Sequence, residues 1–215
     1  NNYIESEWWA LKKIYDMGLL YKGFKIVPYC PRCGTALSSH EVAQGYKDVK
    51  ERSAVAKFQL VDQPDTYFLA WTTTPWTLPS NVALCMNAEF DYVTIHVEAD
   101  NCNYILAKEL VAKHFEEGSY TIVAHHKGCE FEGMHYKPLY TYAHPDKDCY
   151  YVTNDGYVTL TDGTGIVHIA PAFGEDDANV GRRYNLPLVQ LVGEDGKFVD
   201  GCDELTGVFC KDADK

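Results

Sequence analysis

The sequence is poor in basic residues and has no long hydrophobic run. It contains 19 Lys and Arg against 31 Asp and Glu, a formal net charge of −12, so it lacks the broad basic surface that neutralises nucleic-acid phosphates. No stretch reaches the roughly 18 consecutive apolar residues of a membrane-spanning helix. The first residues, NNYIESEWW, have neither the basic nor the apolar part of a secretion signal. We therefore expect a soluble, cytoplasmic chain with no membrane partner, which holds at most a small part of any nucleic acid it binds.

Several catalytic motifs are also missing. The sequence has no G-x-S-x-G elbow, no Walker G-x-x-x-x-G-K-[ST] loop, no G-x-G-x-x-G that opens a helix and no H-E-x-x-H pair. These motifs respectively present a nucleophilic serine, cradle nucleotide phosphates, bind a dinucleotide, and hold a catalytic zinc ion. Their absence removes support for each of these four chemistries.

Cysteines are present but do not suggest a disulfide framework. The eight cysteines are Cys30, Cys33, Cys85, Cys102, Cys129, Cys149, Cys202 and Cys210. Most stand alone in apolar or strand-like runs, where a small thiol packs well, which favours a reduced compartment. Cys30 and Cys33 instead have the spacing of half a structural zinc site. No second C-x-x-C follows and His40 is the nearest spare ligand, so bound zinc and a bare turn with free thiols both remain open.

The hydrophobic pattern predicts few helices and many strands. Ile4, Trp8, Leu11 and Tyr15 recur at helical spacing, and Gly18 follows at the position of a C-terminal cap. Two more helices are predicted within residues 107–117 and 174–184. Strand-like segments bounded by Gly, Pro, Asn and Asp cover residues 54–60, 66–74, 81–87, 90–99, 120–126, 157–170 and 188–199.

Many short strands with few helices favour a closed or strongly curved sheet, since closure removes exposed strand edges. We expect an α+β fold centred on a β-barrel over residues 51–215, with a few peripheral helices. Residues 1–50 are expected to form an N-terminal helix and a small connecting knuckle around the Cys-x-x-Cys turn.

The segment WTTTPWTLPSN, residues 71–81, contains the threonine run Thr72, Thr73 and Thr74. Threonine suits a strand through its β-branching, and the two prolines suit a rigid exit turn. Consecutive strand residues face opposite sides, however, so the run places hydroxyls on both faces of a sheet. A hydroxyl-lined pocket for a small polar ligand is the alternative to an ordinary strand.

A second segment, GTGIVHIAPAFGEDD, covers residues 163–177. Period-two alternation places His168 near the end of a strand that Pro171 terminates. The following helix carries Asp177 in its first turn, where acidic residues commonly cap a helix and complement its dipole. Capping alone and a polar site near the strand end are both compatible with this spacing.

Together these two segments resemble the motifs of the editing domain (CP1) of isoleucyl-tRNA synthetases, the connective insertion of large class I synthetases. The resemblance spans nearly the whole chain, and VPYCPRCGTALSSHEVAQGY resembles the region that precedes the editing barrel. Valyl and leucyl relatives typically read T-T-R-P, whereas this chain has Thr74-Pro75-Trp76, which favours the isoleucyl member. The H-x-G-H and K-M-S-K-S motifs of a whole synthetase are absent, so amino-acid activation is not expected here.

The resemblance implies hydrolysis of the ester that joins a wrong amino acid, chiefly valine, to the terminal adenosine of isoleucine tRNA, and also of valyl-adenylate. The implied partners are the aminoacylated 3′ end of that tRNA and the remainder of the synthetase, and the isolated domain is expected to be monomeric. Editing of this kind requires no cofactor. In the family the Cys30–Cys33 turn shares zinc with a cysteine pair beyond the barrel, outside this chain.

The resemblance also implies roles for individual residues. Asp177 corresponds to the aspartate that holds the substrate's α-ammonium, and His168 to the histidine that shapes the pocket floor and contacts the amino acid or ribose. The Thr72–Thr74 hydroxyls would position the water or the ester, while their methyls limit side-chain size. Asn81 would form a hydrogen bond with adenosine or with the pocket wall. Trp76 lines the pocket or serves only as a packing anchor.

One family feature is missing. Bacterial relatives often read P-G-H-G after the second motif's Ala-Pro, whereas this chain reads Pro171-Ala172-Phe173-Gly174, so that histidine cannot be essential. Two non-enzymatic alternatives stay open: a tRNA-docking module with a degenerate site, and a zinc-knuckle interaction module built on Cys30 and Cys33.

Overall fold

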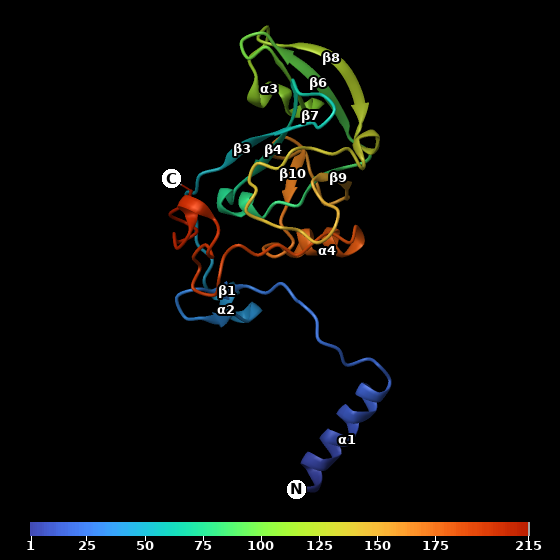
Figure 1. The fold of residues 1–215 in the computed structure, drawn as a ribbon, viewed down its shortest axis with the longest axis vertical. Helices are drawn as coiled ribbons and strands as arrows, with labels where there is room; N and C mark the ends of the chain where they lie inside the picture. Colours follow the sequence, from blue (N-terminus) through green and yellow to red (C-terminus); the bar gives the residue numbers. More distant parts are fainter. Residues whose placement is uncertain (215) are drawn as a thin grey trace.

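The N-terminal helix stands apart from the rest of the molecule. The computed structural model describes residues 1–214. Helix α1 (Asn2–Asp16) projects away from the body of the fold (Figure 1), and none of its residues is buried. It ends where Gly18 takes a φ of +70°, the left-handed conformation of a helix C-terminus. The predicted helix and its cap are thus confirmed.

The connecting region forms a small hairpin followed by a short helix. Strands β1 (Tyr29–Cys30) and β2 (Thr35–Ala36) pair antiparallel, and helix α2 (Ser39–Gln44) follows. Helix α2 was not among the helices predicted from the sequence. The helix nonetheless has a complete capping box, because Ser38 and Glu41 each satisfy a backbone N–H of the other.

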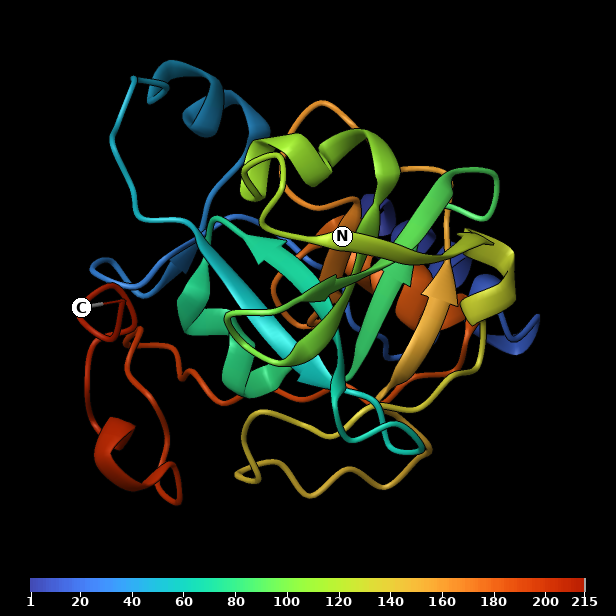
Figure 2. The same cartoon turned by 90° about the horizontal axis from the view of Figure 1, so that it is seen from above.

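The remaining strands form one eight-stranded mixed sheet in the order β8-β6-β7-β4-β10-β5-β9, with β3 paired to β4. Their bounds are β3 (Ala54–Gln59), β4 (Thr66–Thr72), β5 (Ala83–Met86), β6 (Asp91–Val97), β7 (Cys102–Ala107), β8 (Thr121–Lys127), β9 (Tyr151–Asn154) and β10 (Ile166–Ile169). Seen from above, the strands cross at steep angles and curl around an interior (Figure 2). The expected barrel-centred α+β fold is confirmed, in the form of a curled half-barrel with few helices.

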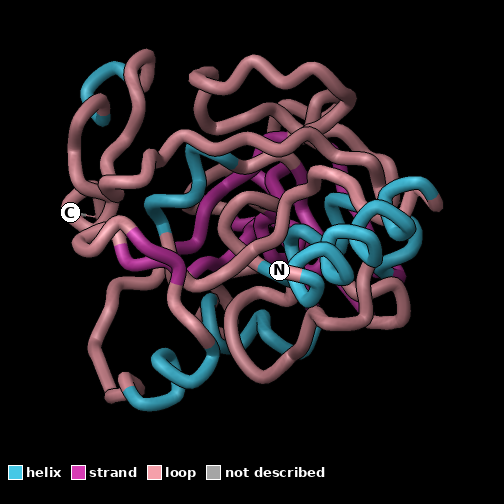
Figure 3. Tube along the Cα trace, turned by 90° about the horizontal axis from the view of Figure 1, so that it is seen from below, coloured by secondary structure: helices cyan, strands magenta, loops and turns pink. Residues whose placement is uncertain are grey.

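The helices around the sheet are short and lie at its margins (Figure 3). They are η1 (Pro75–Ser80), η2 (Lys108–Leu110), α3 (Val111–His114), η3 (Gly128–Phe131), α4 (Glu175–Arg183) and η4 (Asp203–Leu205). The helix predicted within residues 174–184 is confirmed as α4. The one predicted within residues 107–117 is only the short pair η2 and α3.

Four strand predictions differ from the structure. Strands β7 and β9 were not expected; β7 lies inside the sheet, whereas β9 is an edge strand paired with β5. The strand predicted over residues 157–170 is confirmed only at Ile166–Ile169. The apolar run at residues 188–199 was expected to be a strand, but it forms turns and isolated bridges, one of which joins Val192 to Phe198 within the run. Gly193 and Gly196 interrupt it, and Gly196 adopts a φ of +73° beside the Phe209 ring, where a Cβ would clash.

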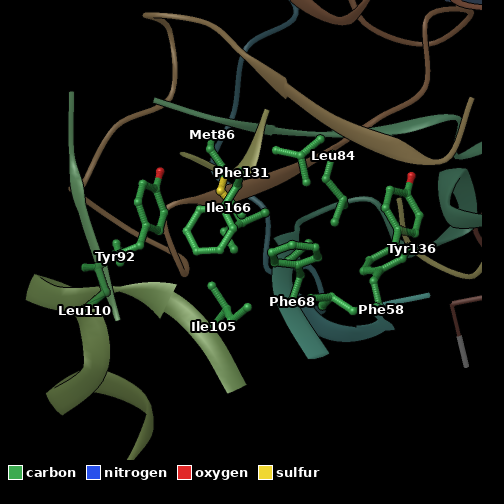
Figure 4. Packing of buried hydrophobic residues seen from close by; sticks show 14 of the residues in the cluster. Phe58, Phe68, Leu84, Met86, Tyr92, Ile105, Leu110, Phe131, Tyr136 and Ile166 are labelled. Atoms are coloured by element: carbon green, nitrogen blue, oxygen red, sulfur yellow. The ribbon is translucent and has the colours of Figure 1, made fainter. Parts of the chain in front are cut away.

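The main core fills the concave side of the sheet. Phe58, Phe68, Leu84 and Ile166 are among its fully buried members, contributed by four different strands (Figure 4). Burial of each such side chain contributes about 1.5–3 kcal/mol. A second cluster packs α4 on the opposite side of β5 and β10, and includes Val180. The segment that carries the second motif is therefore held rigidly against the sheet.

The connecting region contacts the C-terminal segment. Lys211 forms an ion pair of 2.8 Å with Glu51, and a Cβ on Gly196 would lie 2.9 Å from Pro31. The division at residue 50 stays a prediction. Within residues 1–214, no helix is both long enough and apolar enough to cross a membrane.

Candidate functional site

Strand β10 brings the two motifs together. It pairs in parallel with β4 through Val167 and Trp71, and antiparallel with β5, where His168 faces Leu84. Because parallel strands end at the same edge of a sheet, the Thr72 end of β4 lies at the same edge as the Ile169 end of β10. The threonine run and His168 are connected there through Thr77, which lies 91 residues before His168 in the chain.

The threonine run forms a tight hydroxyl-lined turn. Thr72 is buried, Thr74 half-buried and Thr73 exposed. The Thr74 backbone N–H donates to Thr72 Oγ1 at 3.1 Å, and the two hydroxyl oxygens lie 3.4 Å apart. Thr74 then precedes η1, whose first residue is Pro75. This places the hydroxyl and methyl groups of Thr72 and Thr74 in a defined position at the edge of the sheet.

His168 is a deeply buried polar residue of the second motif. It is 5% exposed, and Nε2 lies 2.9 Å from Thr77 Oγ1. Within residues 1–214 its Nδ1 atom has no hydrogen-bond partner. Burial lowers the pKa of His168 to about 4, so the ring is neutral at pH 7.

Thr77 was not singled out from the sequence. It lies in η1, is 4% exposed, and its hydroxyl donates to the Thr74 carbonyl oxygen at 2.8 Å. The available signal was its position three residues after Thr74, where a single 3₁₀ turn brings two hydroxyls to the same side. The hydrogen bonds thus link Thr72, Thr74, Thr77 and His168 in a continuous series.

The buried neutral His168 makes stability depend on pH. Its pKa is about 4 in the folded chain and about 6.5 when unfolded. As pH falls from 6.5 to 4 the unfolded chain gains a proton that the folded chain does not, so stability decreases. Between pH 8 and pH 5, we expect the wild type to lose about 2 kcal/mol more unfolding free energy than His168→Gln. Urea unfolding of both proteins at the two pH values measures this difference, and parallel losses would contradict it.

Asp177 joins α4 to the end of β10. It is the third residue of α4, and its Oδ2 accepts the backbone N–H of Ala170 at 2.9 Å. Burial raises the pKa of Asp177 to about 6, with a smaller upward contribution from Asp176 and an opposing one from the Ala170 bond. The carboxylate is therefore mostly ionised at pH 7, although none of the ion pairs among the described residues includes it.

Asp177 is bonded at the end of the strand that carries His168. Ala170, whose backbone N–H donates to Asp177, is two residues after His168, about 7 Å along the strand. Gly174 keeps this approach open, because a Cβ there would meet Asp177 Cγ at 3.0 Å. A neutral imidazole and an anionic carboxylate thus share one edge of the sheet.

Trp76 points toward the C-terminal segment. Its ring packs edge-on against Phe173, with centroids 5.2 Å apart, and its backbone N–H donates to Asp214 at 2.8 Å. Both rings line a cavity of about 610 Å³ between the barrel and residues 24–31. Neither Thr72, His168 nor Asp177 lines this cavity. Packing explains Trp76 in this structure, and its contact with substrate stays a prediction.

Asn81 is engaged inside the protein. It is 5% exposed, its Nδ2 donates to the Ala83 carbonyl at 2.8 Å, and its Oδ1 accepts from the Tyr136 hydroxyl at 2.6 Å. These bonds anchor the end of the first motif to the core. Its predicted contact with adenosine or with the pocket wall stays a prediction.

The knuckle presents two thiols but not a complete metal site. The Cys33 backbone N–H donates to Cys30 Sγ at 3.3 Å, and hydrogen bonds from Cys33 lower the pKa of Cys30. Among residues 1–214 no group of three or more His, Cys, Asp or Glu could hold a metal, so His40 does not complete the set. The two cysteines supply half of a tetrahedral zinc site, and zinc here stays a prediction.

Comparison with known proteins decides the family. A family model described as "tRNA synthetases class I (I, L, M and V)" matches residues 1–162. The chain is 58% identical over 214 residues to the isoleucine–tRNA ligase of Clostridium acetobutylicum, and 46% identical over 215 residues to that of Picrophilus torridus. The chain belongs to the class I tRNA synthetases. The resemblance of its two motifs to isoleucyl-tRNA synthetases is thereby confirmed.

The match covers all of this synthetase chain but only 20% of each of these two relatives. Among solved structures, the editing domain of the P. knowlesi cytosolic leucyl-tRNA synthetase shares the fold, with a TM-score of 0.51 and 14% identity over 66% of each chain. A second structure, described as GlLeuRS-CP1, has a TM-score of 0.52 at 15% identity, and covers 61% of this chain and 59% of that one. The curled half-barrel is thus the fold of synthetase editing domains.

Proposed function

We propose that this chain is an editing domain that hydrolyses valyl-tRNA formed by mistake on isoleucine tRNA. The observation that carries the proposal is the joint position of the Thr72–Thr77 hydroxyls, neutral His168 and anionic Asp177 at one edge of the sheet. A carboxylate whose pKa is raised by burial and a buried neutral histidine near the same strand end are features that cluster at functional sites. The amino group of an aminoacyl ester would neutralise that carboxylate.

The reaction answers a physical limit on amino-acid selection. Isoleucyl-tRNA synthetase is itself the established example of this limit, in which one extra methylene in an apolar pocket contributes only about 1–3 kcal/mol. A second site that admits valine and excludes isoleucine on size supplies the missing discrimination. The Thr72–Thr74 turn has the features such a site needs. Hydrogen bonds hold the hydroxyls of Thr72 and Thr74, and because hydroxyl and methyl share the same Cβ, the methyls are held as well.

Each group has a defined chemical task in this proposal. Asp177 binds the α-ammonium through a charge-assisted hydrogen bond and so fixes the ester relative to the threonines. An aminoacyl ester is already activated toward water, so the site needs to orient the attacking water more than to deprotonate it. Hydroxyls of the threonine turn supply that orientation. His168, neutral at pH 7, acts as a hydrogen-bonding wall.

The direct test compares two substrates. We expect the chain to hydrolyse valyl-tRNA faster than isoleucyl-tRNA, both carried on isoleucine tRNA, by about tenfold or more. Release of labelled amino acid over time measures both rates, with uncatalysed hydrolysis in the same buffer subtracted. Equal rates would show that the site does not select by size. If neither the chain nor the synthetase that contains it hydrolyses either ester, only a docking role is left.

A further inference from the structure

The hydroxyl of Thr77 has two close partners that fix the direction of its hydrogen bonds, and a third, the Thr74 hydroxyl, lies farther away at 3.4 Å. Its oxygen lies 2.8 Å from the Thr74 carbonyl oxygen and 2.9 Å from His168 Nε2. The same carbonyl accepts the Thr77 backbone N–H at 3.0 Å, closing the turn. A carbonyl oxygen can only accept, and a hydroxyl carries one proton. The hydroxyl proton of Thr77 is therefore directed to the Thr74 carbonyl oxygen.

This direction determines the tautomer of His168. Toward the ring, Thr77 Oγ1 has only lone pairs to offer, so Nε2 must carry the hydrogen and donate. A neutral imidazole has one N–H, which leaves Nδ1 unprotonated and an acceptor. The ring is neutral because its site is buried and, among residues 1–214, no carboxylate is bonded to it.

The acceptor at Nδ1 is unused by the protein. Among the described residues it is one of four buried side-chain polar atoms without a hydrogen-bond partner. Most buried polar groups are satisfied, and an exception at a candidate site points to a partner that arrives from outside. Such a partner must be a donor, which excludes a carbonyl or phosphate oxygen.

We infer that Thr77 is a positioning residue that holds His168 as the Nε2–H tautomer and reserves Nδ1 for an O–H or N–H donor of the bound aminoacyl-adenosine. The inference rests on the proposed function only for the identity of that donor. Without the Thr77 hydroxyl, the ring can carry its hydrogen on Nδ1 instead of Nε2. A protonated Nδ1 could no longer accept a hydrogen bond from the substrate and would repel the substrate's donor group.

The tautomer is measured directly by nitrogen NMR of the chain with ¹⁵N-labelled histidine. In the wild type we expect His168 to show one protonated nitrogen at Nε2 and an unprotonated Nδ1. Thr77→Ser keeps the hydroxyl and should show the same pattern. Thr77→Val keeps the β-branched shape and should show a population protonated at Nδ1. A wild type protonated at Nδ1 would overturn the assignment whatever the activity.

Hydrolysis of valyl-tRNA by the same three proteins tests the reserved acceptor. Thr77→Val should lower kcat by about three- to tenfold with a smaller change in KM, the loss of one neutral hydrogen bond, and Thr77→Ser should restore it. If the tautomer shifts in Thr77→Val while kcat is unchanged, Nδ1 has no role in the reaction. If the wild type has the Nε2–H tautomer but hydrolyses no aminoacyl-tRNA, the proposed function fails and the tautomer assignment stands.

Discussion

Replacing Asp177 by Asn is expected to lower kcat/KM for valyl-tRNA hydrolysis by about a hundredfold. Loss of a hydrogen bond between charged partners costs about 1.5–3 kcal/mol, and about 2.7 kcal/mol corresponds to a factor of one hundred. Asparagine keeps the shape of the side chain and an oxygen that can still accept the Ala170 N–H, now 2.9 Å from Oδ2. The variant therefore removes the charge while the link between α4 and β10 is kept.

Two comparisons separate the charge from the structural link. Asp176→Asn removes the neighbouring exposed carboxylate of the same helical turn and should leave kcat/KM nearly unchanged. Because burial raises the pKa of Asp177 to about 6, the wild type should lose its advantage over Asp177→Asn as pH falls below 6, tenfold per pH unit. An Asp177→Asn enzyme with near-native kcat/KM at pH 7 would show that the ammonium is held elsewhere.

The sequence predicted the parts of the site that depend on local pattern. Alternation placed His168 near a strand end, and the acidic first turn placed Asp177 at the start of α4. The link of Asp177 to the end of β10 follows from a short loop, because Asp177 reaches back only seven residues to Ala170. The link between Thr77 and His168 spans 91 residues. It depends on the pairing of β10 with β4, which no local pattern specifies.

The same distinction explains the errors in the fold. Strand β7 occupies the interior of the ladder but is only six residues long, and the turn-forming residues before it and the helical pattern after it obscured its alternation. Residues 188–199 have the composition of a strand, yet Gly193 and Gly196 allow the chain to fold back, with Gly193 N–H donating to the Lys197 carbonyl. In both segments, local propensity is compatible with either a strand or a turn, and contacts with the rest of the fold decide which of the two forms.

The largest change in specificity is expected at Thr74. It is half-buried and bonded on both sides within the hydroxyl series, whereas Thr73 is exposed, so the structure favours Thr74 as the residue whose methyl limits side-chain size. Thr74→Ala should raise hydrolysis of isoleucyl-tRNA by about ten- to a hundredfold, because one methylene is worth about 1–3 kcal/mol. Hydrolysis of isoleucyl-tRNA and valyl-tRNA by each variant measures the change.

Two further variants divide the threonine into its methyl and its hydroxyl. Thr74→Ser removes the methyl and keeps the hydroxyl, so it should admit isoleucine while valyl-tRNA is still hydrolysed at close to the native rate. Thr74→Val keeps the volume and removes the hydroxyl, so it should still exclude isoleucine but hydrolyse valyl-tRNA more slowly, by about three- to tenfold. If Thr74→Ser excludes isoleucine as strictly as the wild type, the methyl of Thr74 does not set the size limit. Opposite effects of the serine and valine variants on specificity and rate are a pattern that general loosening of the turn cannot produce.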